Sequence, residues 1–168
     1  MIDLDLLLSR DHAELDSCIR TLIETSSIDT AWSTALDTAR LCFAAHAGAT
    51  ECVVNHVLAG LPTLRGPMLD QVLAAHCAQE ALLQRLMRSA SRDQITADAL
   101  ELRELLLAHD EHDRFVVLPT LRRGCDGDDY ARMAQLYATE RVRALGQLGT
   151  LAVPTLDAPS PGIGLAVR

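Results

Sequence analysis

The chain has 168 residues, a length that suits one domain with a single hydrophobic core. Its formal net charge of −8 argues against a general nucleic-acid binder and against docking on an anionic membrane. Hydrophobic residues make up 49% of the chain, yet no apolar stretch approaches the roughly 20 residues of a membrane span. The first residues lack the features of a secretory signal and the five cysteines form no CxxC pair, so we expect a cytoplasmic protein.

Glycine and proline cluster between long segments from which they are almost absent. In chain order, this punctuation predicts helices over residues 3–25, 29–59, 66–90, 93–123 and 127–148. No alternating pattern typical of a β-strand occurs. The residues expected at helix starts are Asp3, Asp29, Pro67, Asp93 and either Asp126 or Asp128. Those expected at helix C-termini are Gly60 and Gly124.

Apolar residues recur at helical spacing, so that one stripe of each helix can face a common core. The stripe of the third helix is expected to hold Leu69, Leu73, Leu83 and Met87. The links between helices are short, which favours antiparallel neighbours. We therefore predict an all-α fold, an up-down four-helix bundle with an additional C-terminal helix. Residues 1–150 would form this bundle and residues 151–168 an irregular tail.

Each of the first four helices carries a histidine on its apolar stripe: His12, His46, His76 and His109. In two helices a carboxylate follows four residues later, in the pairs His76–Glu80 and His109–Asp113. Residues four apart face the same way on a helix, so these carboxylates should point inward too. A buried carboxylate must be protonated, paired or metal-bound, and these stripes carry no Arg or Lys. We therefore predict a metal site; the alternative is a set of core histidines with local partners.

The pattern repeats along the chain. Segment 11–22 resembles segment 75–86, and segment 46–58 resembles segment 109–121. Two helical hairpins would thus each bring a similar set of ligands to a pseudo-twofold site midway through the bundle. Two-metal carboxylate centres in helical proteins are built in this way.

Over about residues 8–123 the chain resembles hemerythrin-like (HHE cation-binding) domains. The most specific element is His109-x-x-x-Asp113 followed by Val116-Val117-Leu118-Pro119, which is similar to the family's H-x-x-x-E-x-x-x-L-x-P. The resemblance implies a non-haem di-iron centre, with two iron ions bridged by oxo or hydroxo groups and carboxylates, or manganese in their place. The ligands that it implies are His12, His46, His76, Glu80, His109 and Asp113.

One position departs from the family pattern. A carboxylate is usual four residues after the second-helix histidine, but here Thr50 occupies that position and Glu51 follows it. Glu51 lies about 100° further round the helix, so it could serve as a seventh ligand if the helix were locally unwound or had a π-bulge. Alternatively, Glu51 faces solvent and the bridge is water, hydroxide or Asp113 alone.

Imidazole and carboxylate ligands suit iron or manganese, and anionic oxygen ligands shift the balance from reversible O2 carriage toward oxidation. We therefore expect a protein that binds and activates O2, peroxide or NO and oxidises a small substrate. One alternative is a module that binds or senses O2, NO or iron without turnover. Another is a metal-free interaction bundle. The sequence leaves open whether the protein is an enzyme.

Small residues flank two of the histidines, among them Ala44 and Ala47 near His46 and Ala78 near His76. They either let helices approach closely or leave a cavity beside the metal for a small organic substrate. The two remaining histidines, His56 and His112, are expected at the surface or beside the ligands.

Overall fold

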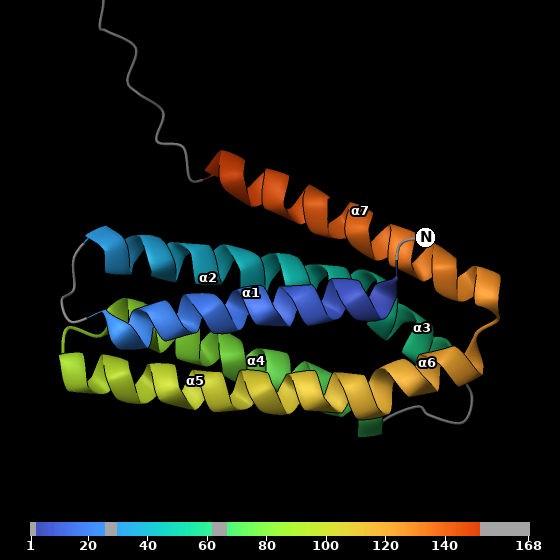
Figure 1. Cartoon of the computed structure of the whole chain (residues 1–168), viewed down its shortest axis with the longest axis horizontal. Helices are drawn as coiled ribbons and strands as arrows, with labels where there is room; N and C mark the ends of the chain where they lie inside the picture. Colours follow the sequence, from blue (N-terminus) through green and yellow to red (C-terminus); the bar gives the residue numbers. More distant parts are fainter. Residues whose placement is uncertain (1–2, 26–29, 62–66, 152–168) are drawn as a thin grey trace, which may run out of the picture.

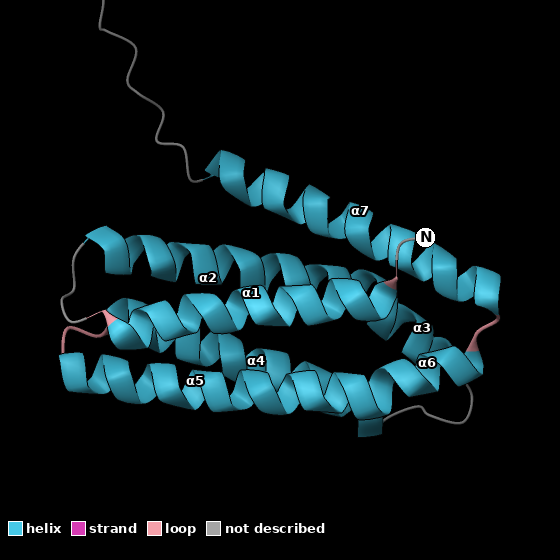
Figure 2. Ribbon diagram, in the orientation of Figure 1, coloured by secondary structure: helices cyan, strands magenta, loops and turns pink. Residues whose placement is uncertain are grey.

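The computed structural model describes residues 3–25, 30–61 and 67–151, and all regular secondary structure in these ranges is helical. The helices are α1 (Leu4–Glu24), α2 (Thr30–Ala49), α3 (His56–Gly60), α4 (Pro67–Arg88), α5 (Arg92–His112), α6 (Leu118–Gly124) and α7 (Gly127–Leu151). Two π-helical segments, η1 (Thr50–Asn55) and η2 (Asp113–Val117), join α2 to α3 and α5 to α6 without a break (Figure 2). The all-α prediction is confirmed.

The predicted helix ends lie within three residues of the observed ones wherever both are described. Asp3 caps α1, accepting a hydrogen bond from a backbone N–H at 3.1 Å, and Asp126 does the same for α7 at 2.8 Å. The predicted cap at Asp93 is wrong, because Ser91 is the N-cap of α5 and Asp93 lies in its first turn. An acid there still interacts favourably with the helix dipole. The cap expected at Asp29 and residues 152–168 of the expected tail lie outside the described residues.

Helices α1, α2, α4 and α5 lie side by side with roughly parallel axes, and α7 runs obliquely over α1 and α2 (Figure 1). α1 packs against α2 and α5, and α4 packs against α5. The contact between α2 and α4 is looser than these. Within the described ranges, none of the helices combines the length and hydropathy needed to cross a membrane.

The hydrophobic core consists of two separate clusters of buried side chains. The first includes Leu22, Trp32, Leu86 and Ile95. The second includes Leu4, Leu58, Leu121 and Tyr137, so that α7 contributes to it. Buried polar side chains from α1, α2, α4 and α5 lie on these helices between the two clusters.

The buried face of α4 differs from the expected one by one residue. Val72 and Leu86 are buried, whereas Leu73 is 39% exposed and Met87 is 48% exposed. The expected stripe at Leu73 and Met87 is therefore wrong. Because α4 packs closely on α5 and only loosely on α2, its buried side is set by α5. The rotation also buries a neutral amide, Gln79, in place of a carboxylate, which costs less free energy.

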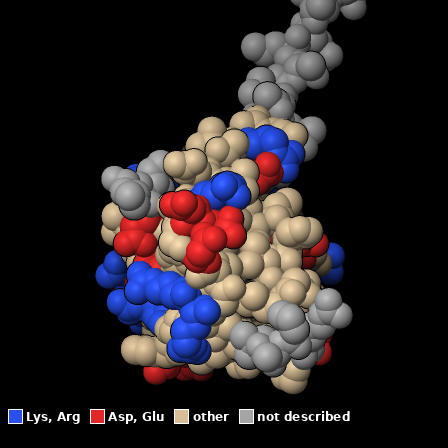
Figure 3. Space-filling model, turned by 90° about the vertical axis from the view of Figure 1, so that its right-hand side faces the viewer, with Lys and Arg blue, Asp and Glu red and all other residues tan. Residues whose placement is uncertain are grey.

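Many of the charged side chains at the surface form ion pairs. All fifteen basic residues are arginines. Arg85 pairs with Asp98 and with Glu101, and Arg103 pairs with Asp16 at 2.7 Å. At the end of the molecule seen in Figure 3, basic side chains border acidic ones beside a wide uncharged area.

The orientation of α4 can be tested by truncating one leucine on each of its two sides. Leu86→Ala should lower the free energy of unfolding by about 2–5 kcal/mol, because Leu86 is fully buried. Leu73→Ala should change it by about 0.5 kcal/mol or less. Urea unfolding followed by circular dichroism measures both. The reverse order of the two effects would show that α4 faces the core as the sequence pattern suggested.

Candidate metal centre

The four histidines of the predicted stripes form one buried layer. His12, His46, His76 and His109 are 4%, 0%, 8% and 3% exposed. Their ring centroids lie 4.7–5.7 Å apart in the contacting pairs. Each histidine comes from a different helix: α1, α2, α4 and α5. The fold therefore brings together side chains that are up to 97 residues apart in the sequence.

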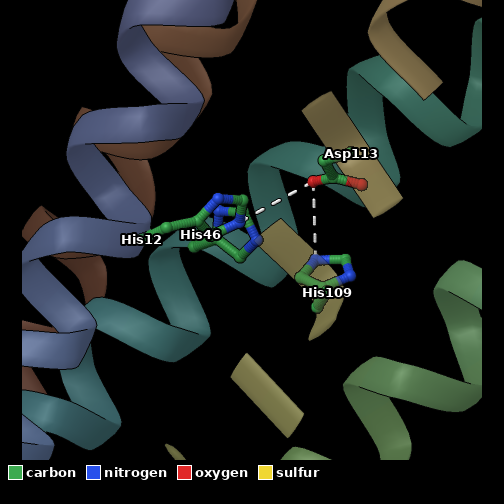
Figure 4. A group of neighbouring side chains, drawn as sticks. All are labelled: His12, His46, His109 and Asp113. Carbon is green, nitrogen blue, oxygen red and sulfur yellow. Dashed lines mark ion pairs between the residues drawn. The ribbon is translucent and has the colours of Figure 1, made fainter. Parts of the chain in front are cut away.

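Asp113 adds a carboxylate to this layer. It is 2% exposed and is the first residue of η2. Its Oδ2 lies 3.5 Å from Nε2 of His109 and 3.7 Å from Nε2 of His12 (Figure 4). Burial raises the pKa of Asp113 to about 7, against the opposing effect of His12. A nearby cation would stabilise the ionised form of a carboxyl group that is buried in this way.

Two histidines present a ring nitrogen toward the layer without a hydrogen-bond partner among the described residues. His12 uses Nδ1 to contact Oδ1 of Asp110 at 2.8 Å, and His46 uses Nδ1 to contact the Tyr137 hydroxyl at 2.9 Å. Their Nε2 atoms are buried and unpartnered. Metal-ligating histidines have this arrangement, in which one ring nitrogen is held by a polar partner and the other faces the ion.

The spacing of the donor atoms fits a metal ion. His12, His46, His109 and Asp113 each offer one atom, and these four atoms lie within 4.8 Å of one another. Ligand atoms bound to one ion at about 2.0–2.2 Å are separated by roughly 3–4.4 Å, so a small contraction of the side chains would suffice. His76 lies next to this group, its Nε2 being 3.1 Å from Nε2 of His109.

The electrostatics of the layer favour neutral imidazoles. Burial lowers the pKa of His76 to about 4, with a smaller contribution from His12. Burial also lowers the pKa of His46 and of His109, and the neighbouring imidazoles lower them further. Neutral imidazole is the form that binds a metal. His46, His76 and His109 are therefore in the neutral, metal-binding form at neutral pH.

The C-terminal helix contributes to the site in a way that the sequence analysis missed. The hydroxyl of Tyr137 donates a hydrogen bond to Oδ2 of Asp11 at 2.8 Å and also contacts His46. Asp11 is 4% exposed and forms an ion pair with Arg141, whose Nε lies 2.5 Å from Oδ1. Tyr137 and Asp11 are 126 residues apart, and neither has a local spacing signal that would pair them.

The structure does not bring Glu51 and Glu80, the other two predicted ligands, into the group. Both side chains are exposed. The π-bulge that would have helped Glu51 does occur, as η1, but Thr50 is among its buried residues and Glu51 is not. Glu80 accepts a hydrogen bond from Gln84 at 3.3 Å on the outside of α4. The buried position on this helix belongs to Gln79, three residues after His76.

The small residues near His46 lie partly at a groove between α2 and α4. The groove has a volume of about 1130 Å³, and its walls include Phe43, Ala44, Ala47 and Glu80. The Phe43 ring packs edge-on against His76, with ring centroids 6.0 Å apart, so it separates the groove from the layer. Of the remaining histidines, His56 is exposed and His112 is half-buried.

Comparison of the chain with protein-family models, with curated proteins and with solved structures found no match. The resemblance to hemerythrin-like domains rests on the motif around the histidines and stays a prediction.

We expect the metal-free protein to lose stability as the pH falls from 6.5 to about 4. In this range the unfolded chain protonates its histidines, whereas folded His76, with a pKa of about 4, stays neutral, as do His46 and His109. Asp113 and Asp11 act in the opposite direction, because burial raises their pKa in the folded state. Three histidines outweigh two acids, giving about 1.4 kcal/mol per pH unit for a net difference of one proton.

Urea unfolding between pH 4.5 and 7.5 in the presence of a chelator measures this dependence. His76→Gln should reduce the slope, because it removes one of the depressed pKa values, whereas the exposed His56→Gln should leave the slope unchanged. A free energy of unfolding that rises as the pH falls would contradict the expectation that His46, His76 and His109 stay neutral in the folded protein.

Proposed function

We propose that this protein binds a transition-metal ion in the buried histidine layer, and that the ion is iron. The observation that carries the proposal is the convergence of two unpartnered Nε2 atoms, of His12 and His46, with a buried carboxylate, Asp113. Imidazole and carboxylate together suit iron, and also manganese or zinc, better than a soft metal. A metal ion would relieve the cost of burying this carboxylate.

The grouping of the ligand atoms supports the binding of one ion. Its ligands would be His12, His46, His109 and Asp113, and His76 lies beside them. The two-iron centre implied by the family resemblance would need further carboxylates. Glu51 and Glu80 are exposed, so they would have to turn inward before they could bridge a second ion. The number of ions bound per chain decides between the two forms of the proposal.

A bound iron would supply O2, peroxide or NO binding and redox chemistry, as the sequence analysis anticipated. The chain would exclude bulk water, because every histidine of the layer is at most 8% exposed. This burial favours a small diatomic or triatomic ligand. The packing of α1 on α2 and α5, and of α4 on α5, supports an up-down four-helix bundle around the site, with α7 added.

Oxidation of a small organic molecule remains the enzymatic form of the proposal. The groove between α2 and α4 supports it, since Phe43, which forms part of the groove wall, packs its ring against His76. Binding or sensing of a gas without turnover is the second candidate, and the burial of the layer supports that one. With an added reductant or oxidisable substrate, consumption of O2 by the iron-loaded protein in excess of the iron present would separate turnover from simple binding.

Anaerobic titration with Fe(II), with calorimetry and metal analysis, tests the site itself. We expect Asp113→Asn to weaken binding at least 10- to 100-fold, because the anionic ligand is lost. Glu80→Gln is the matched control on the exposed side of α4 and should leave the affinity unchanged.

The stability of the metal-free variants gives an independent check. Asp113→Asn should not destabilise the metal-free protein strongly, since it removes a buried ionisable group whose pKa is already raised. Absence of bound iron in the wild-type protein would refute the proposed function. Equal loss of affinity in Glu80→Gln would show that Glu80 turns inward to bind metal.

A further inference from the structure

Both tyrosines of the chain lie on α7, and each donates a hydrogen bond to an aspartate of α1. Tyr130 contacts Asp5, and Tyr137 contacts Asp11. The two differ in one respect: only Tyr137 also contacts a histidine of the layer, His46. Tyr137 is fully buried, whereas Tyr130 is half-buried.

We propose that Tyr137 is a positioning residue for the metal centre, which fixes the tautomer and the orientation of His46 so that Nε2 faces the ion. The inference rests on the proposed function as far as the metal is concerned. The tautomer itself is a property of the metal-free chain and can be measured without any metal.

The tautomer follows from counting hydrogen-bond donors. The Tyr137 hydroxyl has one proton, and it donates that proton to Oδ2 of Asp11 at 2.8 Å. Toward Nδ1 of His46, at 2.9 Å, the hydroxyl oxygen can therefore only accept. A neutral imidazole has one N–H, so Nδ1 must carry it and Nε2 keeps its lone pair. That Nε2 is one of the buried ring nitrogens of the layer that have no hydrogen-bond partner among the described residues.

Arg141 holds the far end of this chain of contacts. Its Nε lies 2.5 Å from Oδ1 of Asp11, and one of its terminal nitrogens donates to Glu14 at 2.7 Å. The guanidinium keeps the Asp11 carboxylate in place as an acceptor, so the direction of the Tyr137 hydrogen bond is fixed from the Asp11 side. Helix α7 thereby contacts the layer through Tyr137, whose hydroxyl is oriented by Asp11 of α1 and, through Asp11, by Arg141.

The same contacts bear on Thr50, which stands where the hemerythrin-like pattern that the sequence resembles has a carboxylate. Thr50 is 1% exposed and lies beside the Tyr137 hydroxyl. A glutamate here would bring a second buried carboxylate to the acceptor side of Tyr137, whereas threonine is small and uncharged. Threonine at this position therefore leaves Asp11 as the acceptor of the Tyr137 hydrogen bond.

The test uses the full chain and the variants Tyr137→Phe and Tyr130→Phe, each of which removes one tyrosine–aspartate hydrogen bond between α7 and α1. In the metal-free proteins, long-range 1H–15N correlation spectra of 15N-histidine-labelled samples report the tautomer of each ring. We expect the Nδ1–H form of His46 in the wild type and in Tyr130→Phe. Tyr137→Phe should show loss of that form in favour of Nε2–H.

The second readout is binding of Co(II), whose visible spectrum reports ligand geometry. Tyr137→Phe should weaken Co(II) binding 10- to 100-fold and shift the ligand-field bands. Tyr130→Phe should leave both unchanged. A merely structural role for Tyr137 would affect stability in both variants without moving the tautomer or the Co(II) spectrum.

An unchanged His46 tautomer together with unchanged Co(II) affinity in Tyr137→Phe would overturn the proposal. If the wild type binds no Co(II), the metal function fails, yet the tautomer measurement still judges the positioning role. If Tyr137→Phe does not fold, Arg141→Gln replaces it, since Arg141 is 19% exposed and acts on the same Asp11. This variant should shift His46 in the same direction, and an unshifted tautomer there would equally count against the proposal.

Discussion

The structure depends on the burial of four imidazoles and one carboxylate in a single layer between two apolar clusters. Polar groups in such a place cost free energy unless each of them finds a partner. His12 finds Asp110 and His46 finds Tyr137, while His76 and His109 contact each other. These partners come from α5, α7 and α4, so the polar contacts of the layer join helices that the apolar clusters also hold together. Nε2 of His12 and Nε2 of His46 have no hydrogen-bond partner among the described residues, and both histidines belong to the group that could hold a metal ion.

The sequence predicted the helices and the four histidines well, because both depend on local periodicity. Glycine and proline mark helix ends, and a histidine that interrupts an apolar stripe must lie on the buried side of that stripe. The rotation of α4 was not predictable in this way. Leu73, Glu80 and Met87 form a stripe about as regular as Val72, Gln79 and Leu86, and both stripes pass through His76. Packing against α5 decides between them, and this packing is not encoded in the local pattern.

The two π-helical segments bear on the internal repeat. η1 begins four residues after His46, and η2 begins four residues after His109, so the two hairpins deviate from α-helical geometry at matching positions. Pro119 explains part of this in the second hairpin, because a proline cannot donate to the preceding turn. The first hairpin has His56 at the matching position and still forms a π-helix. The widened turns therefore accompany the histidine layer itself, as π-bulges often do at functional sites.

The division of the core into two apolar clusters has a consequence for folding cooperativity. Helices α1, α2 and α4 run through both clusters, but the side chains at the boundary between the clusters are polar and are joined by hydrogen bonds and ring contacts rather than by apolar packing. A metal ion coordinated by residues of α1, α2 and α5 would tie the two clusters together at their boundary. Amide exchange in the helix segments on either side of the layer would then become coupled more strongly through the ion.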